Sequence, residues 1–320
     1  VYKRQATSYG TNGSNGVVFI KTRKGNASEG GPVFNYKQTN GINSPQFEVD
    51  KGFQNRDLFH SLLSNGAVND KYFSMSGGDY RFRHFLSFSS RNEEGMIIWK
   101  DKNYFDRKTV RANFDFLPLD NLSLSLNTSY SSIDAIMPPS DNHIYGLMYN
   151  TLVAYSPWQE SDSTSLSQLG IKFGSKRLVA SANVKYYPFK NNYRFGLNTV
   201  QLNAKFGIDD AERKNSNLFP SGYNYALFNG GFKALVNSNE TNTIFDFGAS
   251  HNYNFGGINT TTSFSAQFYD HLWDGVEISR DSFGQNAVTD IGSGSNITVA
   301  GEWSGNCLLY TSPSPRDGIG

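Results

Sequence analysis

Apolar and polar residues alternate with a period of two along most of the sequence. Between residues 122 and 130, Leu122, Leu124, Leu126 and Tyr130 alternate with serine and asparagine. Successive side chains of a β-strand point to opposite faces, so this pattern predicts strands with one apolar and one polar face. Ten strands are expected, at residues 33–42, 70–76, 80–89, 108–117, 122–132, 177–187, 193–208, 241–254, 258–269 and 297–303.

The connections between these strands alternate in length. Short turns are expected at Gly77–Asp79, Pro118–Asn121, Pro188–Asn192 and Gly256–Gly257. Long polar loops are expected at about 90–107, 132–176, 209–240 and 270–296. Short turns at one end and long loops at the other are typical of an outer-membrane β-barrel, whose tilted strands need about 9–11 residues to cross. The sequence therefore predicts an all-β fold, a partial transmembrane antiparallel β-barrel.

A soluble β-sandwich or a large β-solenoid would also show alternation. Neither demands strands this long, nor loops sorted by length to one end. The direction of the apolar faces separates these folds. In a sandwich, Phe82, Phe114, Leu124 and Phe247 would pack against a second sheet, whereas in a barrel they would form an outward band.

Two irregularities interrupt the pattern. His84 falls on the apolar face of its expected strand. The alternation also changes phase between Leu197 and Val200, which predicts a β-bulge near Asn198 and Thr199.

The composition narrows the classes of function. Aromatic residues make up 15% of the chain although all hydrophobic residues together reach only 38%, as expected when every second strand residue is polar. A net charge of +1 gives no electrostatic footprint for nucleic acid. The single cysteine cannot form an internal disulfide or a cysteine-based zinc site. No apolar run approaches the ~18 residues of a membrane helix.

No catalytic constellation emerges from the residues. The five histidines are scattered, and none pairs with another at metal-ligand spacing. The carboxylate pairs Glu93–Glu94 and Asp209–Asp210 fall in expected loops, where solvated charge is the favoured interpretation. No Gly-x-Ser-x-Gly elbow is present. We therefore expect no enzyme activity, no cofactor and no metal.

Residues 6–25 combine a glycine-rich turn, a short apolar strand and a basic turn. Glycines permit a positive φ or a close backbone approach, and no Gly-Lys-Ser/Thr follows them as in a phosphate loop. This segment resembles the end of the plug domain in TonB-dependent outer-membrane transporters of the SusC/RagA type, found in Bacteroidetes. The matching positions are Tyr9, Gly10, Gly13, Asn15, Gly16, Val17, Thr22, Arg23, Lys24 and Gly25.

Two further stretches are similar to the same family. Residues 73–97 look like the first barrel hairpin, and residues 185–195 look like a periplasmic turn. The resemblance implies a barrel of about 22 strands. Residues 6–31 would then end the plug, and residues 32–305 would form the N-terminal half of the barrel. It also implies the outer membrane of a Gram-negative bacterium, a SusD-like lipoprotein partner, and energy delivered through TonB.

The two ends resemble translated sequencing adapter. VYKRQ begins the chain and CLLYTSPSPRD lies near its end. We expect residues 1–5 and 306–320 to be artefact, so that the genuine chain is cut at both ends and its signal peptide and TonB-contacting segment lie upstream. An ordinary frayed terminus is the alternative.

Polar strand residues point into the lumen of a barrel, toward the plug or a substrate path. The lumen-facing candidates are Arg81, Arg83, Arg111, Asn113, Asp115, Asn127 and Lys185, for which hydrogen bonding and salt bridging to the plug is the favoured interpretation. Aromatic loop residues could stack on a sugar ring or a peptide side chain, or form an interfacial belt. The candidates of this kind are Trp99, Tyr145, Tyr149, Trp158, Tyr223 and Trp273.

The leading hypothesis is a fragment of a SusC/RagA-like transporter that imports oligosaccharides, or else peptides. Its partners would be a SusD-like lipoprotein, TonB and outer-membrane lipid. A siderophore or cobalamin receptor of the wider TonB-dependent group is the first alternative. A non-transport β-rich surface module for binding or adhesion is the second.

Overall fold

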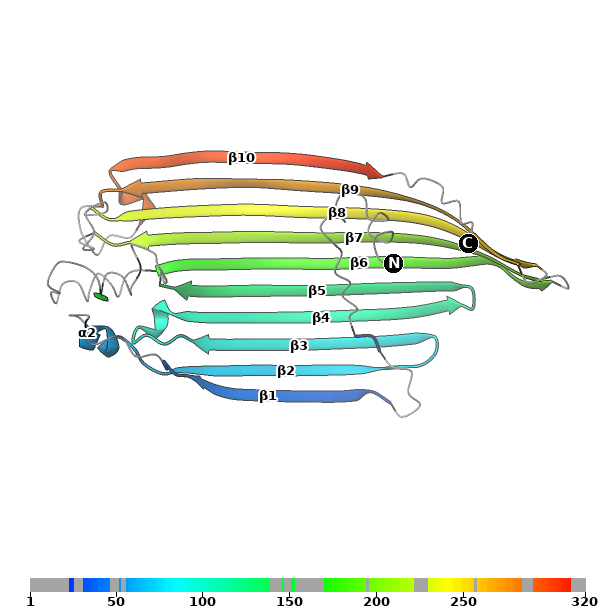
Figure 1. Cartoon of the computed structure of the whole chain (residues 1–320), viewed down its shortest axis with the longest axis horizontal. Helices are drawn as coiled ribbons and strands as arrows, with labels where there is room; N and C mark the ends of the chain where they lie inside the picture. Colours follow the sequence, from blue (N-terminus) through cyan, green and yellow to red (C-terminus); the bar gives the residue numbers. More distant parts are fainter. Residues whose placement is uncertain are drawn as a thin grey trace.

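Ten strands form one antiparallel sheet in which each strand pairs with its neighbours in sequence (Figure 1). The computed structural model describes residues 23–25, 31–46, 52, 56–138, 146, 151–152, 170–193, 196–221, 230–255, 258–283 and 290–311. The strands are β1 (Val33–Asn43), β2 (Gly66–Gly78), β3 (Phe82–Glu94), β4 (Tyr104–Leu119), β5 (Leu122–Met137), β6 (Gly170–Tyr193), β7 (Gly196–Phe219), β8 (Phe232–Phe255), β9 (Ile258–Asp281) and β10 (Asn296–Thr311). The sheet is open, with β1 and β10 at its edges.

All ten expected strands are confirmed, but most run further toward the long connections. β7 was expected to end at residue 208 and continues to Phe219. The pairs Glu93–Glu94 and Asp209–Asp210 therefore lie in strands, which corrects their assignment to loops. Alternation of apolar with polar residues fades in these extensions, while the backbone hydrogen bonds of the ladder continue.

The expected turn at 188–192 and the expected bulge at Asn198–Thr199 are both wrong. β6 continues to Tyr193, and its pairing with β7 shifts at residues 187–188, which together face Gln201. Pro188 has no N–H to donate to the ladder, so a bulge is where a strand accommodates it. The Tyr187 N–H donates instead to the carbonyl of Asn121, at 2.8 Å.

The two kinds of connection lie at opposite ends of the sheet (Figure 1). The short connections follow β2, β4, β6 and β8. The long-connection end carries the helix α2 (Arg56–Ser61) and the 3₁₀ turns η2 (Lys100–Lys102) and η4 (Ile291–Ser293). A small core cluster of Phe59, Leu63 and Leu152 packs there. None of the helices in the described ranges is long and apolar enough to cross a membrane.

One face of the sheet is apolar and exposed, and we call it the apolar face. It carries Phe82, Val110, Leu126, Leu178 and Phe247, whose exposed fractions lie between 39% and 50%. Within the described ranges the strands form this one sheet, so no second sheet covers these residues. That arrangement matches the outward band of a partial barrel and not the packed interior of a sandwich.

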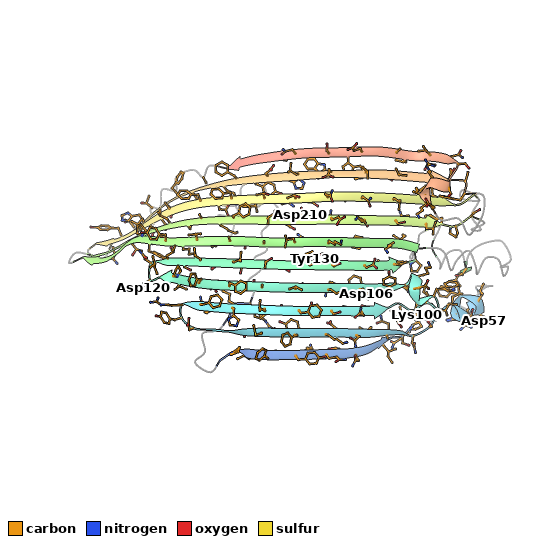
Figure 2. The ribbon with its side chains drawn as sticks, turned by 180° about the vertical axis from the view of Figure 1, so that it is seen from behind. Asp57, Lys100, Asp106, Asp120, Tyr130 and Asp210 are labelled. Carbon is orange, nitrogen blue, oxygen red and sulfur yellow. The ribbon has the colours of Figure 1, made fainter. Side chains whose placement is uncertain are left out.

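The apolar face changes character along its length. On β5 it carries apolar residues and Thr128 from Leu122 to Tyr130, about nine residues, which is close to the ~9–11 that a tilted membrane strand needs. We call this stretch and the matching rows of the other strands the apolar band. Beyond Tyr130 the same face carries Ser132 and Asp134. Figure 2 shows Tyr130 midway along its strand and Asp106 closer to the long-connection end.

The opposite face, which we call the polar face, is partly covered. Ser87, Asn113 and Asp115 are buried there, as is Phe85. His84 lies on the apolar face as expected, where its ring stacks on Phe82 with the ring centres 5.7 Å apart.

Candidate functional site

The basic turn at residues 23–25 lies on the polar face, against β2 to β4. Lys24 Nζ lies 2.7 Å from Asp115 Oδ1, and Arg83 lies 3.5 Å from the other carboxylate oxygen. The hydroxyl of Ser125 donates a third contact to Asp115, at 2.6 Å. The Asp115 side chain is only 6% exposed, so two cations and one hydroxyl compensate the charge of a buried carboxylate.

The residues on either side of Lys24 are also held by the sheet. The Asn113 side-chain amide donates to the carbonyl of Arg23 at 2.7 Å. Gly25 is buried against backbone, because a β-carbon there would come within 2.5 Å of the His84 N and O atoms and 2.8 Å of the Gly77 carbonyl oxygen. Only glycine permits this approach. Side chains and sheet backbone thus anchor three consecutive residues.

The described part of the expected plug motif is therefore Lys24 and Gly25, together with Arg23. The other motif residues, Tyr9, Gly10, Gly13, Asn15, Gly16, Val17 and Thr22, lie outside the described residues.

Among the lumen-facing candidates, the structure brings Arg83, Asn113 and Asp115 together around the basic turn. Arg111 lies on the same face and lines a hollow of about 710 Å³ together with Lys37 and Arg107. Asn127 and Lys185 share the polar face as well, since they belong to the same alternating sets as Asp115 in the paired ladder.

Arg81 departs from the expectation. It lies in the turn between β2 and β3, where its backbone N–H donates to Asp79 at 2.7 Å and its Nε donates to the Tyr80 hydroxyl at 2.7 Å. β3 begins one residue later than the position of Arg81, so this side chain belongs to an exposed turn and not to the polar face of a strand.

The aromatic candidates divide in a similar way. Trp99 lies in the connection before η2, as expected. Trp273 was expected in a loop but lies within β9, because the strand continues to Asp281. Tyr145, Tyr149, Trp158 and Tyr223 lie outside the described residues.

Trp273 belongs to a reciprocal arrangement that we call the tryptophan pair. Trp273 faces Gly305 of β10, and Trp303 of β10 faces Gly275 of β9. A β-carbon at either glycine would collide with the six-membered part of the opposite indole, so each indole lies over the glycine of the neighbouring strand. The two indoles remain 37% and 36% exposed on the polar face. They place exposed aromatic surface on this face.

Polar groups surround this surface. The Tyr269 hydroxyl donates to Asn242 Oδ1 at 2.6 Å, and His271 Nδ1 lies 2.5 Å from the same oxygen. The His271 ring stacks on Trp273, with ring centres 4.9 Å apart. The polar face thus offers aromatic surface beside hydrogen-bonding side chains, the combination that small-molecule sites use for contact and orientation.

The sequence analysis missed Trp303 and the role of the two glycines. A signal was present, because Trp273-x-Gly275 and Trp303-x-Gly305 have the same spacing on neighbouring strands. Antiparallel pairing of two such stretches places each tryptophan opposite a glycine. Among the residues with described positions, no group of three histidine, cysteine or acidic side chains could hold a metal ion.

Comparison with solved structures gives the fold a precedent. No protein-family model matches the chain, and no curated protein sequence matches it. A chain of the RagAB peptide importer in its closed-closed state superposes with a TM-score of 0.68 at 13% identity, covering 92% of this chain and 41% of that one. The fold is that of a partial antiparallel β-barrel.

Two further structures extend the likeness. A chain of the RagAB peptide transporter gives a TM-score of 0.70 at 14% identity, covering 95% of this chain and 42% of its own length. A chain of the importer in its open-open state gives 0.68 at 13% identity, covering 96% and 42%. This chain spans about two fifths of the length of these importer chains, and the likeness at this identity concerns the fold alone.

Proposed function

We propose that this chain is part of a SusC/RagA-like TonB-dependent outer-membrane transporter. One observation carries the proposal: a sheet with the fold of importer chains keeps its apolar face exposed and holds the basic turn at residues 23–25 on its polar face. An exposed apolar band suits lipid. The bound turn suits a plug domain that fills the lumen, and the plug-end resemblance of residues 6–25 supports the same assignment.

The proposed mechanism involves no covalent chemistry. Loops and the lumen wall capture the ligand, a SusD-like lipoprotein covers the barrel, and TonB moves the plug with energy from the inner-membrane proton gradient. The docked turn is the part of this mechanism that the described residues supply. Its contacts to Asp115, Asn113 and the β2–β3 backbone would have to persist or break as a unit when the plug moves.

An oligosaccharide is the proposed ligand. The tryptophan pair favours this class, since two flat indole faces on the lumen side suit the apolar faces of sugar rings. A peptide is the second candidate, and it is favoured by the fold likeness to a peptide importer. One uptake experiment tests both ligand classes.

Uptake of fluorescently labelled oligosaccharides and peptides can be compared in the producing bacterium with the gene intact and deleted. Ferric siderophore and cobalamin complete the panel, because they identify the alternative receptor type. Uptake should depend on the gene and stop when a protonophore collapses the proton gradient. Gene-independent uptake of the whole panel, or absence of the protein from the outer-membrane fraction, would refute the transport function. A surface binding module would then be the better hypothesis.

The double variant W273A/W303A tests the ligand surface itself. Loss of both rings should weaken oligosaccharide binding roughly tenfold, given ~0.5–1.5 kcal/mol for each aromatic contact. The matched variant F206A/F247A removes two rings from the apolar face and should leave binding unchanged. Unchanged oligosaccharide binding in W273A/W303A, together with intact gene-dependent uptake, would remove the tryptophan pair from the path but leave the transporter in place.

A further inference from the structure

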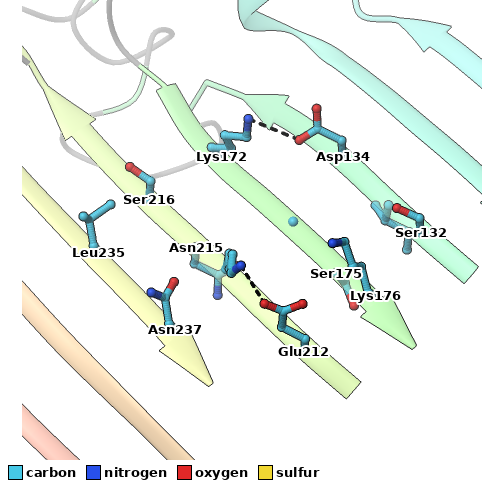
Figure 3. A pocket seen from close by; sticks show the side chains of 13 residues that line it. Ser132, Asp134, Lys172, Ser175, Lys176, Glu212, Asn215, Ser216, Leu235 and Asn237 are labelled. Atoms are coloured by element: carbon cyan, nitrogen blue, oxygen red, sulfur yellow. Dashed lines mark ion pairs between the residues drawn. The ribbon is translucent and has the colours of Figure 1, made fainter. Parts of the chain in front are cut away.

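A hollow of about 420 Å³ lies on the apolar face, beyond the apolar band toward the long connections. It spans β5 to β8 and is lined by three lysines, Lys172, Lys176 and Lys214, and by two acidic residues, Asp134 and Glu212. Figure 3 shows Lys172, Lys176, Asp134 and Glu212 around the hollow, with Lys172 directed toward Asp134. The hollow is separate from the tryptophan pair and the basic turn, both of which occupy the opposite face.

The lysines are available to an external anion. Lys172 lies 3.4 Å from Asp134 and Lys214 lies 2.6 Å from Glu212, but these lysine side chains remain 52% and 63% exposed. Exposed ion pairs contribute little, about 0–1 kcal/mol in the median case, so a multiply charged ligand can compete for them. Lys176 is exposed and forms no salt bridge with any residue of the described ranges.

A second cation extends the same row. Cross-strand pairing places Lys108 of β4, Ser132 of β5 and Lys176 of β6 side by side, and Lys108 is also exposed. Asp106 and Asp134 stand one row further out, whereas Glu212 of β7 pairs directly with Lys176 and ends this row of cations. The first polar row above the band therefore presents two lysines, on β4 and β6, on either side of Ser132 of β5.

The row immediately below is apolar. Val110, Tyr130 and Leu178 pair across the same three strands and are 50%, 44% and 39% exposed. An exposed apolar surface and a lysine row thus meet at a single boundary. This is the pattern of an amphiphile whose hydrocarbon chains lie on the band and whose anionic headgroup reaches the lysines.

We propose that this boundary binds a lipid with a phosphorylated headgroup, held by Lys172, Lys176 and Lys214 while its acyl chains cover Val110, Tyr130 and Leu178. The proposal rests on the proposed function, because long loops of an outer-membrane barrel face the cell exterior. The lipid is then one of the outer leaflet, where phosphorylated glycolipid of the lipid A type supplies both acyl chains and phosphate. Lysine binds phosphate as a point charge.

The protein purified from outer membranes in mild detergent provides the test. It is titrated with lipid A carrying two phosphates, with lipid A from which the phosphates have been removed, and with inorganic phosphate, and bound lipid is counted by native mass spectrometry. The variant K172Q/K176Q should bind the phosphorylated lipid roughly 25-fold more weakly, from about fivefold for each lysine. K172R/K176R keeps both charges and should bind as the unaltered protein does.

A matched control removes two lysines from the polar face. K185Q/K205Q changes the net charge by the same amount and should leave lipid binding unchanged. Equal weakening in K172Q/K176Q and K185Q/K205Q would overturn the site, because net charge alone would then explain the effect. Equal binding of lipid A with and without phosphates would also overturn it.

Two outcomes separate the lipid from other causes. Competition by inorganic phosphate at the concentration of the lipid would show a simple anion site and overturn the assignment to lipid. Heat-modifiable migration in gels verifies that each variant is folded, so weak binding in folded K172Q/K176Q supports the site when the controls behave as stated, and unweakened binding in that variant overturns it. Failure of the proposed function appears independently, as absence of the protein from the outer-membrane fraction.

Discussion

Lys24 and Asp115 form an ion pair of 2.7 Å across 91 residues of sequence. It joins the end of the glycine-rich segment to the fourth strand of the sheet. Asp115 is buried while Lys24 keeps 44% of its side chain exposed, so the two partners are unequal. Loss of the lysine leaves Asp115 with Arg83 and Ser125, whereas loss of the carboxylate leaves two cations close together with no counter-charge.

Substitution D115N should therefore release the basic turn more than K24M does. We expect a cost of about 1–2 kcal/mol, below the ~3–5 kcal/mol of a fully buried pair because Lys24 is partly solvated. Trypsin cleavage after Arg23 reports the release, and its rate should rise about 5–30-fold in D115N. D246N, which alters a polar-face aspartate on β8, should leave this cleavage rate unchanged. Equal cleavage in D115N and D246N would contradict the anchoring role.

Gly25 gives a second, uncharged test of the same docking. Substitution G25A places a β-carbon against the backbone of His84 and Gly77, which cannot move aside as a flexible side chain could. We expect a loss of about 1–3 kcal/mol in docking, seen as faster hydrogen exchange at residues 23–25. G301A on β10 is the matched control, because nothing lies within 4 Å of a β-carbon at that position. Unchanged exchange in G25A would mean that the turn is not held against β2 and β3.

The strands could be predicted from the sequence where the residues of the apolar face are apolar, because their alternation with polar residues then has a clear period of two. Phe82, Phe88 and Leu126 lie on one face as the alternation predicts, and all three are exposed. Past Tyr130 the same face continues with Ser132 and Asp134 while the opposite face carries Ile133 and Ala135, so apolar residues no longer stay on one face and the signal is lost. The ladder persists there because backbone N–H and C=O groups pair whatever the side chains are.

The candidate site was harder to predict for a different reason. Nothing in the spacing of Lys24 and Asp115 tells that they touch, because contact across 91 residues depends on how the sheet and the basic turn are placed in space. The contacts of Trp273 and Trp303 were easier to predict. Their shared Trp-x-Gly spacing predicts reciprocal contacts once β9 and β10 are known to pair, but strand pairing has to be established first.

The tryptophan pair depends on its glycines. Substitution G275A puts a methyl group under the Trp303 indole and beside the Asn237 carbonyl oxygen, so the ring must lift from the sheet. We expect a cost of about 1–2 kcal/mol and a shifted Trp303 resonance in ¹⁹F NMR of fluorotryptophan-labelled protein. The Trp99 and Trp158 signals should stay in place, and G301A should shift none of the four. A Trp303 signal that does not respond to G275A would exclude the stacked arrangement.

The turn between β2 and β3 should respond to pH through Asp79. The backbone N–H groups of Phe82 and Arg81 donate to Asp79 Oδ1 at 2.8 and 2.7 Å, and they hold the pKa of this carboxyl below its usual 3.8. The folded state therefore favours the ionised form. Its stabilising contribution is complete above the pKa of the unfolded chain and disappears as the pH falls through the lower, folded value.

Hydrogen exchange at the Arg81 and Phe82 amides measures this contribution. As the pH falls below about 5, Asp79 takes up a proton, and the protection of these amides in the unaltered protein should decline once exchange rates are corrected for intrinsic exchange. D79N keeps an acceptor oxygen but no titratable group, so its protection should be weaker and independent of pH in that window. D79A should lose protection at every pH, while D120A in the next short turn should retain it. A decline with falling pH that persists in D79N would assign the effect to another group.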